Sequence, residues 1–143
     1  GGIALGTLAF KTGLAEALGF RLTSLLGVQS ELGLVALATV IATVLSETTS
    51  NTASANMVVP VVIAFARSSG IDPVLPAVAA TMGASLGFML PVSTPCNAIV
   101  YASGRIPLTT MMRHGIWLDV AGIVGVITVV TLLGPFVRAA LGG

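Results

Sequence analysis

Long apolar runs separated by short polar breaks dominate this chain. An apolar run over 33–45 leads into seven consecutive polar or charged residues, 46–52, and a second apolar run follows over 53–66. As a helix, each run of about 13–15 residues is some 20–22 Å long, whereas a bilayer crossing needs about 20 residues. Since neither run is long enough to cross, the pattern predicts a re-entrant helical hairpin over 32–66 with the polar residues at its tip.

A second polar break interrupts the apolar stretch 74–104. Two prolines, Pro91 and Pro95, flank a Ser-Thr pair there, and each proline removes a backbone hydrogen bond from a helix. Because the stretch is longer than one span, the break falls near the middle of the membrane. The pattern predicts a discontinuous transmembrane helix over 74–104, with one half-helix over 74–90 and the start of another over 98–103.

Two further membrane elements and a basic loop complete the predicted topology. The segment 1–20 has the composition of a membrane-helix end, and 116–138 has that of a last membrane helix. The loop 105–115 carries two arginines, one histidine and no acid. Because cytoplasmic loops are enriched in Lys and Arg, this loop is predicted to be cytoplasmic, which places the hairpin entry and the C-terminus outside.

Composition agrees with this architecture. The 143 residues are 55% hydrophobic and 8% charged, with net charge +1 and mean hydropathy +1.06, values typical of an all-α polytopic membrane protein. No basic tract indicates nucleic-acid binding, and a single cysteine excludes an internal disulfide. The chain opens without methionine inside an apolar segment, so we expect it to be part of a longer protein and to need the remainder for activity.

The two polar breaks together predict one binding site. A hairpin tip and an interrupted helix that meet near the midplane are a recurrent arrangement in secondary transporters. Unwound turns offer backbone carbonyls to a hard cation such as Na⁺, and half-helix N-termini offer N–H groups to an anion. Hydroxyl and amide side chains add neutral donors and acceptors. This chemistry fits a carboxylate or sulfate that is bound together with Na⁺.

Both breaks also resemble the motifs of one transporter family. The segments concerned are Ser50-Asn51-Thr52-Ala53 with Asn56-Met57, and Leu90-Pro91-Val92-Ser93-Thr94-Pro95-Cys96-Asn97-Ala98-Ile99-Val100-Tyr101. They closely resemble the divalent anion:sodium symporter (DASS) family, whose members carry dicarboxylates, citrate or sulfate. The resemblance covers essentially the whole chain as the C-terminal half of a member. It implies one half of an inverted-repeat transporter that works by alternating access, with sodium-coupled symport of small divalent anions.

The resemblance also implies ligands for the substrate and for sodium. Substrate contacts would come from Ser50, Asn51, Thr52, Thr94 and Pro95. A sodium site would use the backbone carbonyls of Ser46, Thr49 and Ser93 together with the Asn51 side chain. Na⁺ would be the co-transported ion, with no organic cofactor, in an integral protein of the bacterial inner membrane. Expected partners are a small anion, membrane lipid and the N-terminal half, within a homodimer of the full-length protein.

Other functions stay open from the residues alone. A proton-driven or arsenite-type relative of similar architecture would need a titrating carboxylate, for which Glu47 is the deep candidate, although hydrogen-bonded support of the tip is an equally good role for it. An intramembrane enzyme is disfavoured, because Ser50 and Ser93 lack a nearby base and His114 is predicted across the membrane. An inert truncated fragment is a further alternative. Asp119 is expected near a helix start, where an anion favours the dipole.

Overall fold

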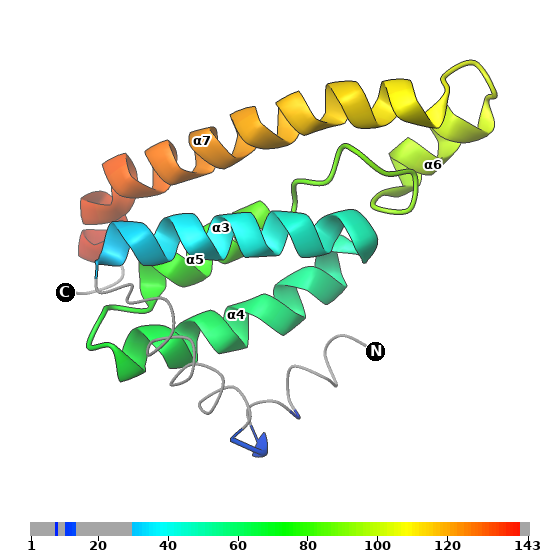
Figure 1. Ribbon diagram of the computed structural model, residues 1–143. Helices are drawn as coiled ribbons and strands as arrows, with labels where there is room; N and C mark the ends of the chain where they lie inside the picture. The colour runs from blue at the N-terminus through cyan, green and yellow to red at the C-terminus, as the bar shows by residue number, and fades with distance from the viewer. Residues whose placement is uncertain (1–7, 9–10, 14–29, 141–143) are drawn as a thin grey trace.

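The described part of this computed structural model comprises residue 8 and the ranges 11–13 and 30–140. Within these ranges the regular structure is helical and contains no strand (Figure 1). The membrane-helix end predicted over 1–20 lies outside the described residues except at 8 and 11–13. The helices are α3 (Glu31–Thr48), α4 (Asn51–Ser68), α5 (Val74–Gly83), α6 (Pro95–Ala102) and α7 (Leu108–Ala140).

Helices α3 and α4 form an antiparallel hairpin that turns at Thr49 and Ser50 (Figure 1). Serine caps start both helices, since Ser30 Oγ accepts a hydrogen bond from Gly33 N at 3.1 Å and Ser50 Oγ accepts one from Ala53 N at 3.2 Å. Each helix has 18 residues, because the polar residues beside the turn continue the helices instead of forming an extended tip. At about 27 Å each helix is longer than predicted, so helix length does not by itself require re-entrance.

The helix predicted over 74–90 ends instead at Gly83, so that prediction is wrong at its C-terminal end. Hydroxyls from α3 take the place of the missing helical donors. Thr43 Oγ1 shares its proton between Thr39 O at 2.9 Å and Gly83 O at 3.1 Å, and Ser46 Oγ donates to Ala84 O at 2.7 Å. Carbonyls at a helix end must find partners outside the helix; here Leu86 N donates to Gly83 O at 3.0 Å, and hydroxyls of α3 add contacts to Gly83 O and Ala84 O. The position of this helix end therefore depends on tertiary contacts.

Residues 84–94, called the linking segment below, contain no helix. Helix α6 follows with Thr94 as its N-cap, whose side chain accepts from Asn97 N at 3.2 Å, and with Pro95 at the first helical position. Proline suits that position because its missing N–H would have no helical acceptor there. The interruption predicted from the prolines is thus present, but it extends further toward the N-terminus than they indicate.

Helix α7 has 33 residues and begins at Leu108. The predicted loop 105–115 is wrong over its second half, since Arg113 and His114 lie in the first turns of this helix and are exposed. His114 Nδ1 contacts Thr110 O at 2.8 Å, one helical turn earlier. Two of the three basic residues used to orient the topology therefore lie at a helix start, and only Arg105 lies in the loop before it.

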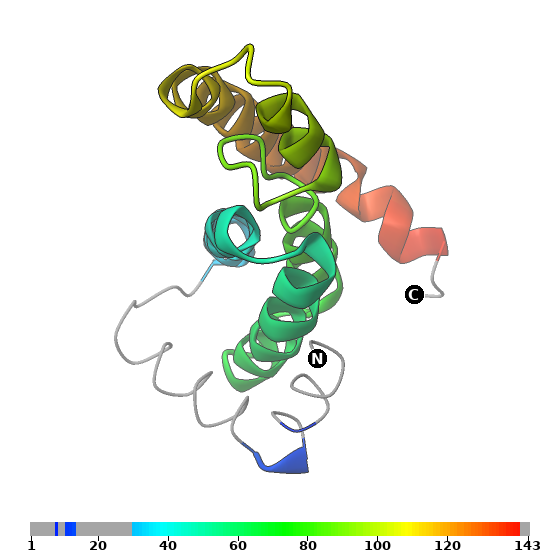
Figure 2. The ribbon, with the colours of Figure 1, turned by 90° about the vertical axis from the view of Figure 1, so that its right-hand side faces the viewer.

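The helices are arranged in three layers. Helices α3 and α5 form the central layer, which contacts α4 on one side and α7 on the other (Figure 1). Figure 2 shows the same arrangement from the end of the molecule, with α6 beside the start of α7. The linking segment and α6 together run antiparallel to α7 at that end. This places the hairpin turn and the interrupted segment at the same end of the molecule.

Small side chains allow the central helices to pack closely. A Cβ at Gly83 of α5 would lie 2.7 Å from Thr39 O of α3, and such close approach is typical of membrane helix packing. A first buried cluster joins α3, α4 and α5 through Ala38, Ala42, Val58, Val62, Ala80 and Ala84. A second joins α3, α5 and α7 through Val35, Leu75, Ala79, Val126 and Val130.

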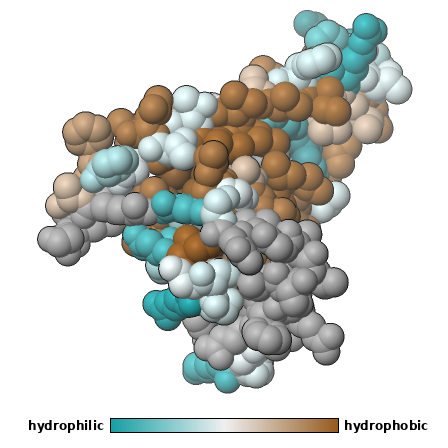
Figure 3. Space-filling view, turned by 60° about the vertical axis from the view of Figure 1, so that its left-hand side comes forward, coloured by the Kyte–Doolittle hydropathy of each residue, from teal (hydrophilic) through white to brown (hydrophobic). Residues whose placement is uncertain are grey.

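The outer face of α7 is apolar and exposed. Trp117 on this face is 71% exposed, and large aliphatic side chains continue along the helix. Figure 3 shows an apolar band along the upper part of the molecule, with polar residues gathered at its far end. Glu31–Thr48 and Leu108–Phe136 are long and apolar enough to cross a membrane by length and composition. Both properties agree with a helical membrane protein.

Candidate functional site

Two helix N-termini carry the side chains predicted to contact substrate. Ser50 caps α4 and Thr94 caps α6, and each hydroxyl accepts from an amide three residues later. An N-terminus leaves backbone N–H groups free and carries partial positive charge, a combination that suits an anion. Asn51 follows Ser50 as the first residue of α4 and is partly buried. Both predicted substrate motifs therefore have the local geometry of anion-binding helix ends.

Three oxygen atoms converge beside the hairpin turn. Ser46 is fully buried, and its Oγ lies 2.8 Å from Asn51 Oδ1 and 2.7 Å from Ala84 O. A serine hydroxyl has one proton and can donate it to only one of these oxygens. The remaining contact is satisfied when the Asn51 amide is rotated, so that its Nδ2 donates to Ser46 Oγ. Hard cations such as Na⁺ prefer oxygen ligands of this neutral kind.

Gly87 of the linking segment packs closely against the hairpin. Its φ is +156°, and a Cβ there would lie 2.7 Å from Ser93 Oγ and 3.4 Å from Ser46 Oγ. Ser93 Oγ donates to Gly87 O, and Asn97 Nδ2 donates to the same carbonyl at 3.0 Å. The structure thus brings Ser46 close to Ser93, two of the residues predicted for sodium, although they come from different elements.

Three other predicted site residues, Thr49, Thr52 and Pro95, do not connect the hairpin to the interrupted segment. Thr49 Oγ1 donates back to Leu45 O at 2.8 Å, and Thr52 is exposed, with its carbonyl accepting from Asn56 Nδ2 at 2.7 Å. Pro95 is exposed at the start of α6. Within the described ranges, no hydrogen bond connects these three residues across the two helix N-termini. Thr52 and Pro95 are therefore exposed at this end of the molecule, whereas Thr49 is half-buried.

Two buried carboxylates hold the linking segment. Glu47 accepts from Met89 N with Oε1 at 3.0 Å and from Leu90 N with Oε2 at 2.9 Å. Asp119 Oδ1 accepts from Phe88 N at 3.3 Å. Three successive backbone amides are thus bound by side chains of α3 and α7. Of the two roles left open for Glu47, the contacts seen are those of hydrogen-bonded support.

The structural role predicted for Asp119 is wrong. The residue is only 4% exposed and lies in the interior of α7, because the helix begins at Leu108, not near 116. Its contact is with a backbone amide 31 residues away, which no spacing rule in the sequence indicates. The available signal was the presence of an acid inside a long apolar run, since such residues in membrane helices face the protein interior.

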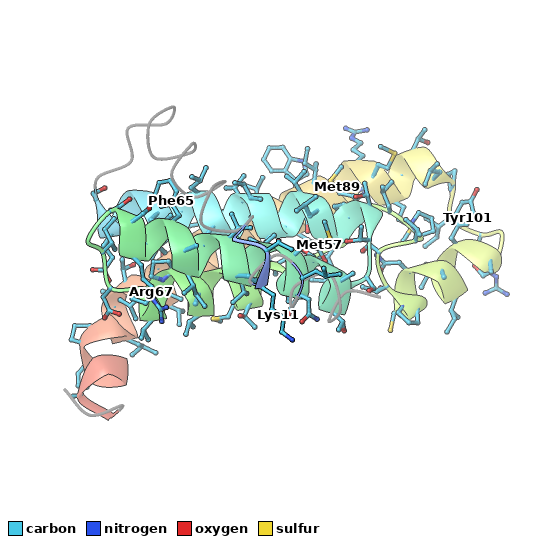
Figure 4. All side chains as sticks on the ribbon, turned by 90° about the horizontal axis from the view of Figure 1, so that it is seen from below. Lys11, Met57, Phe65, Arg67, Met89 and Tyr101 are labelled. Atoms are coloured by element: carbon cyan, nitrogen blue, oxygen red, sulfur yellow. The ribbon has the colours of Figure 1, made fainter. Side chains whose placement is uncertain are left out.

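Helix α7 approaches the linking segment through a face of small residues. A Cβ at Gly115 would lie 2.6 Å from Met89 Cα, and one at Gly122 would lie 2.8 Å from Leu86 Cδ2. Gly115, Asp119 and Gly122 recur at intervals of four and three residues and so share one helix face. In Figure 4 the labelled Met57 and Met89 lie toward the hairpin turn, whereas Phe65 and Arg67 mark the opposite end.

Comparison with known proteins gives a consistent result. A family model described as the sodium:sulfate symporter transmembrane region matches residues 1–139. A sodium-dependent dicarboxylate transporter, SdcS, from Staphylococcus saprophyticus is 39% identical over 94% of this chain and 26% of its own length. SdcS from Staphylococcus aureus strain MRSA252 is 39% identical over 96% of this chain and 26% of its own length. The chain thus spans about a quarter of the length of these curated relatives.

Proposed function

Because the chain belongs to the sodium:sulfate symporter family of divalent anion:sodium symporters, we propose that it is part of a transporter that moves small divalent anions together with Na⁺ by alternating access. The 143 residues correspond to 26% of the length of SdcS. They are therefore better placed within the C-terminal half of such a protein than as the whole of that half. The remaining chain would supply the inverted counterpart of the hairpin.

The observation that carries this proposal is the convergence of the two interrupted elements. Ser46 of α3 and Ser93 of the linking segment both lie against Gly87, and Asn51 contacts Ser46. In our proposal Na⁺ is bound by the backbone carbonyls of Ser46, Thr49 and Ser93 and by the Asn51 side chain. The neutral oxygens and the buried setting support this assignment.

The anion is assigned to the two capped helix N-termini. We place its oxygens against Ser50, Asn51 and Thr52 of the hairpin and against Thr94 and Pro95 of the interrupted helix. Hydroxyls and free amides at helix N-termini support this assignment, because they bind anions without a fixed positive charge. The names of both relatives support a dicarboxylate as the substrate class. Re-entrance of the hairpin, the external C-terminus, lipid contacts and a full-length homodimer belong to the same proposal.

Sodium-dependent uptake tests the proposed function. The full-length protein is reconstituted in vesicles, and uptake of labelled succinate is measured with external Na⁺ or with choline in its place. We expect uptake with Na⁺ and little with choline. Equal uptake in both buffers would overturn sodium coupling, and uptake in choline that follows an imposed pH gradient would favour the proton-driven alternative. Sulfate and citrate as competitors then identify the preferred anion.

A further inference from the structure

The linking segment is held by side chains from two helices that are far apart in sequence. Its own backbone bonds are short-range turns, such as Leu86 N to Gly83 O at 3.0 Å and Ser93 N to Leu90 O at 3.2 Å. The amides of Phe88, Met89 and Leu90 instead point to carboxylate oxygens. Since buried amides must be paired, these carboxylates decide how this part of the backbone is oriented.

The two carboxylates differ in the number of their oxygens that accept a hydrogen bond. Both oxygens of Glu47 accept an amide, whereas Asp119 Oδ2 is buried without a hydrogen-bond donor in the part of the chain that the structure describes. The two carboxylates bind neighbouring amides, since Asp119 accepts from Phe88 N and Glu47 accepts from Met89 N. An amide in place of Glu47 would lose one acceptor and turn an NH₂ group toward a backbone N–H. An amide in place of Asp119 could keep its bond to Phe88 N, because an asparagine side chain still offers one acceptor oxygen and only one oxygen of Asp119 is used.

We propose that Glu47 and Asp119 are positioning residues of the transport site, which hold the Phe88–Leu90 backbone between α3 and α7 and so fix the linking segment. The segment ends with Ser93 and Thr94, and its Gly87 lies against Ser46. Neither carboxylate needs to touch sodium or the anion. This inference rests on the proposed function for its transport readout, but its geometric part stands on the hydrogen bonds alone.

The asymmetry between the carboxylates separates positioning from proton coupling. If they hold the backbone, Glu47→Gln and Asp119→Ala disturb the site, whereas Asp119→Asn is tolerated. If they carried a coupling proton, both amide variants would abolish transport. The matched control is Asp72→Asn, an acid-to-amide change between α4 and α5 at the opposite end of the hairpin.

The first readout is sodium-dependent succinate uptake by the full-length protein in vesicles, normalised to the amount of protein incorporated. We expect Glu47→Gln and Asp119→Ala to raise the Na⁺ concentration for half-maximal uptake by about tenfold, as the loss of charge-assisted hydrogen bonds predicts. Asp119→Asn and Asp72→Asn stay within about twofold of the parent. Maximal uptake at saturating Na⁺ changes less than the sodium requirement, because bound Na⁺ favours the ordered segment.

The second readout does not depend on transport. Cys96 is exposed and lies two residues after Thr94, so its rate of thiol labelling reports on the end of the linking segment. In a full-length background with any other cysteine replaced by serine, we expect labelling at least about threefold faster in Glu47→Gln and Asp119→Ala, because the segment opens locally. Labelling in Asp119→Asn matches the parent.

Two results would overturn the inference. One is that Asp119→Asn is as defective as Asp119→Ala in both readouts, which would mean that charge and not backbone support matters. The other is that Glu47→Gln behaves like Asp72→Asn in labelling. If the parent protein shows no sodium dependence at all, the proposed function fails, while the labelling comparison still decides whether the two carboxylates position the segment.

Discussion

The hairpin turn and the linking segment meet at one site but are stabilised in different ways. At the turn, Ser50 caps its own helix and Thr49 bonds to a carbonyl four residues earlier. In the linking segment, the Phe88, Met89 and Leu90 amides bond to side chains 31, 42 and 43 residues away. The turn is thus built from local contacts, and the linking segment is built from contacts with α3 and α7. Damage to distant helices should therefore affect the second region more than the first.

A side chain added at Gly87 should reduce transport more than the other changes described here. In Gly87→Ala the new Cβ meets Ser93 Oγ at 2.7 Å in a positive-φ conformation, and strain plus overpacking cost roughly 2–6 kcal/mol. We expect succinate uptake to fall at least tenfold at equal protein level. Gly70→Ala is the control, because Gly70 also has positive φ but no atom within 4 Å of its Cβ position. Similar losses in both variants would show that strain alone, and not contact with Ser93, is responsible.

Forcing α7 away from the linking segment should give the next largest effect. The Cβ of Gly115→Ala would lie 2.6 Å from Met89 Cα, and overpacking of this kind costs about 1–3 kcal/mol. We expect a lower thermal unfolding midpoint and faster Cys96 labelling. Gly125→Ala in the same helix has nothing within 4 Å and should be neutral or slightly stabilising. Equal midpoints for the two variants would contradict the close approach of α7.

Substitution of two buried serines can distinguish an effect on sodium binding from an effect on the stability of the hairpin. Ser46 Oγ bonds to Ala84 O at 2.7 Å, and Ser54 Oγ bonds to Ala42 O at 2.7 Å. Either change to alanine removes a buried hydroxyl-to-carbonyl hydrogen bond, at a cost of about 1 kcal/mol. We expect similar loss of thermal stability in both variants. The sodium requirement should rise only in Ser46→Ala, because the Ser46 hydroxyl contacts the Asn51 side chain that is proposed to bind Na⁺. A raised requirement in Ser54→Ala as well would mean that sodium binding follows hairpin stability in general.

The two helix caps should give the smallest effect. Ser50→Ala and Ser30→Ala each remove an N-cap worth about 1 kcal/mol, so their unfolding midpoints should drop by similar amounts. Only Ser50→Ala is expected to raise the succinate concentration for half-maximal uptake, because only that cap lies at the proposed anion site. An unchanged succinate affinity in Ser50→Ala would show that Ser50 is not part of the anion site.

Features that depend on local contacts were predicted more accurately from the sequence than features that depend on distant contacts. The sequence predicts a polar turn within 46–52, and the structure places it at Thr49 and Ser50; the second half-helix, predicted to start at 98, begins three residues earlier at Pro95. Both features are nearly right because capping residues and prolines act on their immediate neighbours. The end of α5 was misplaced by seven residues, from 90 to 83, since α3 hydroxyls terminate it. The start of α7 was set too late, because polar Arg113 and His114 suggested a loop although they occupy exposed helical positions.

The sequence by itself determined the helical membrane class, the presence of two polar interruptions and the residues that cap them. These features depend on hydrophobic run length and on side chains that bond within one turn. Only the tertiary structure decided that Glu47 and Asp119 together bind three successive amides, and that Gly87 lies against both Ser46 and Ser93. Those contacts join segments that are six to 43 residues apart, and a backbone amide leaves no mark in the sequence of which distant side chain it will meet.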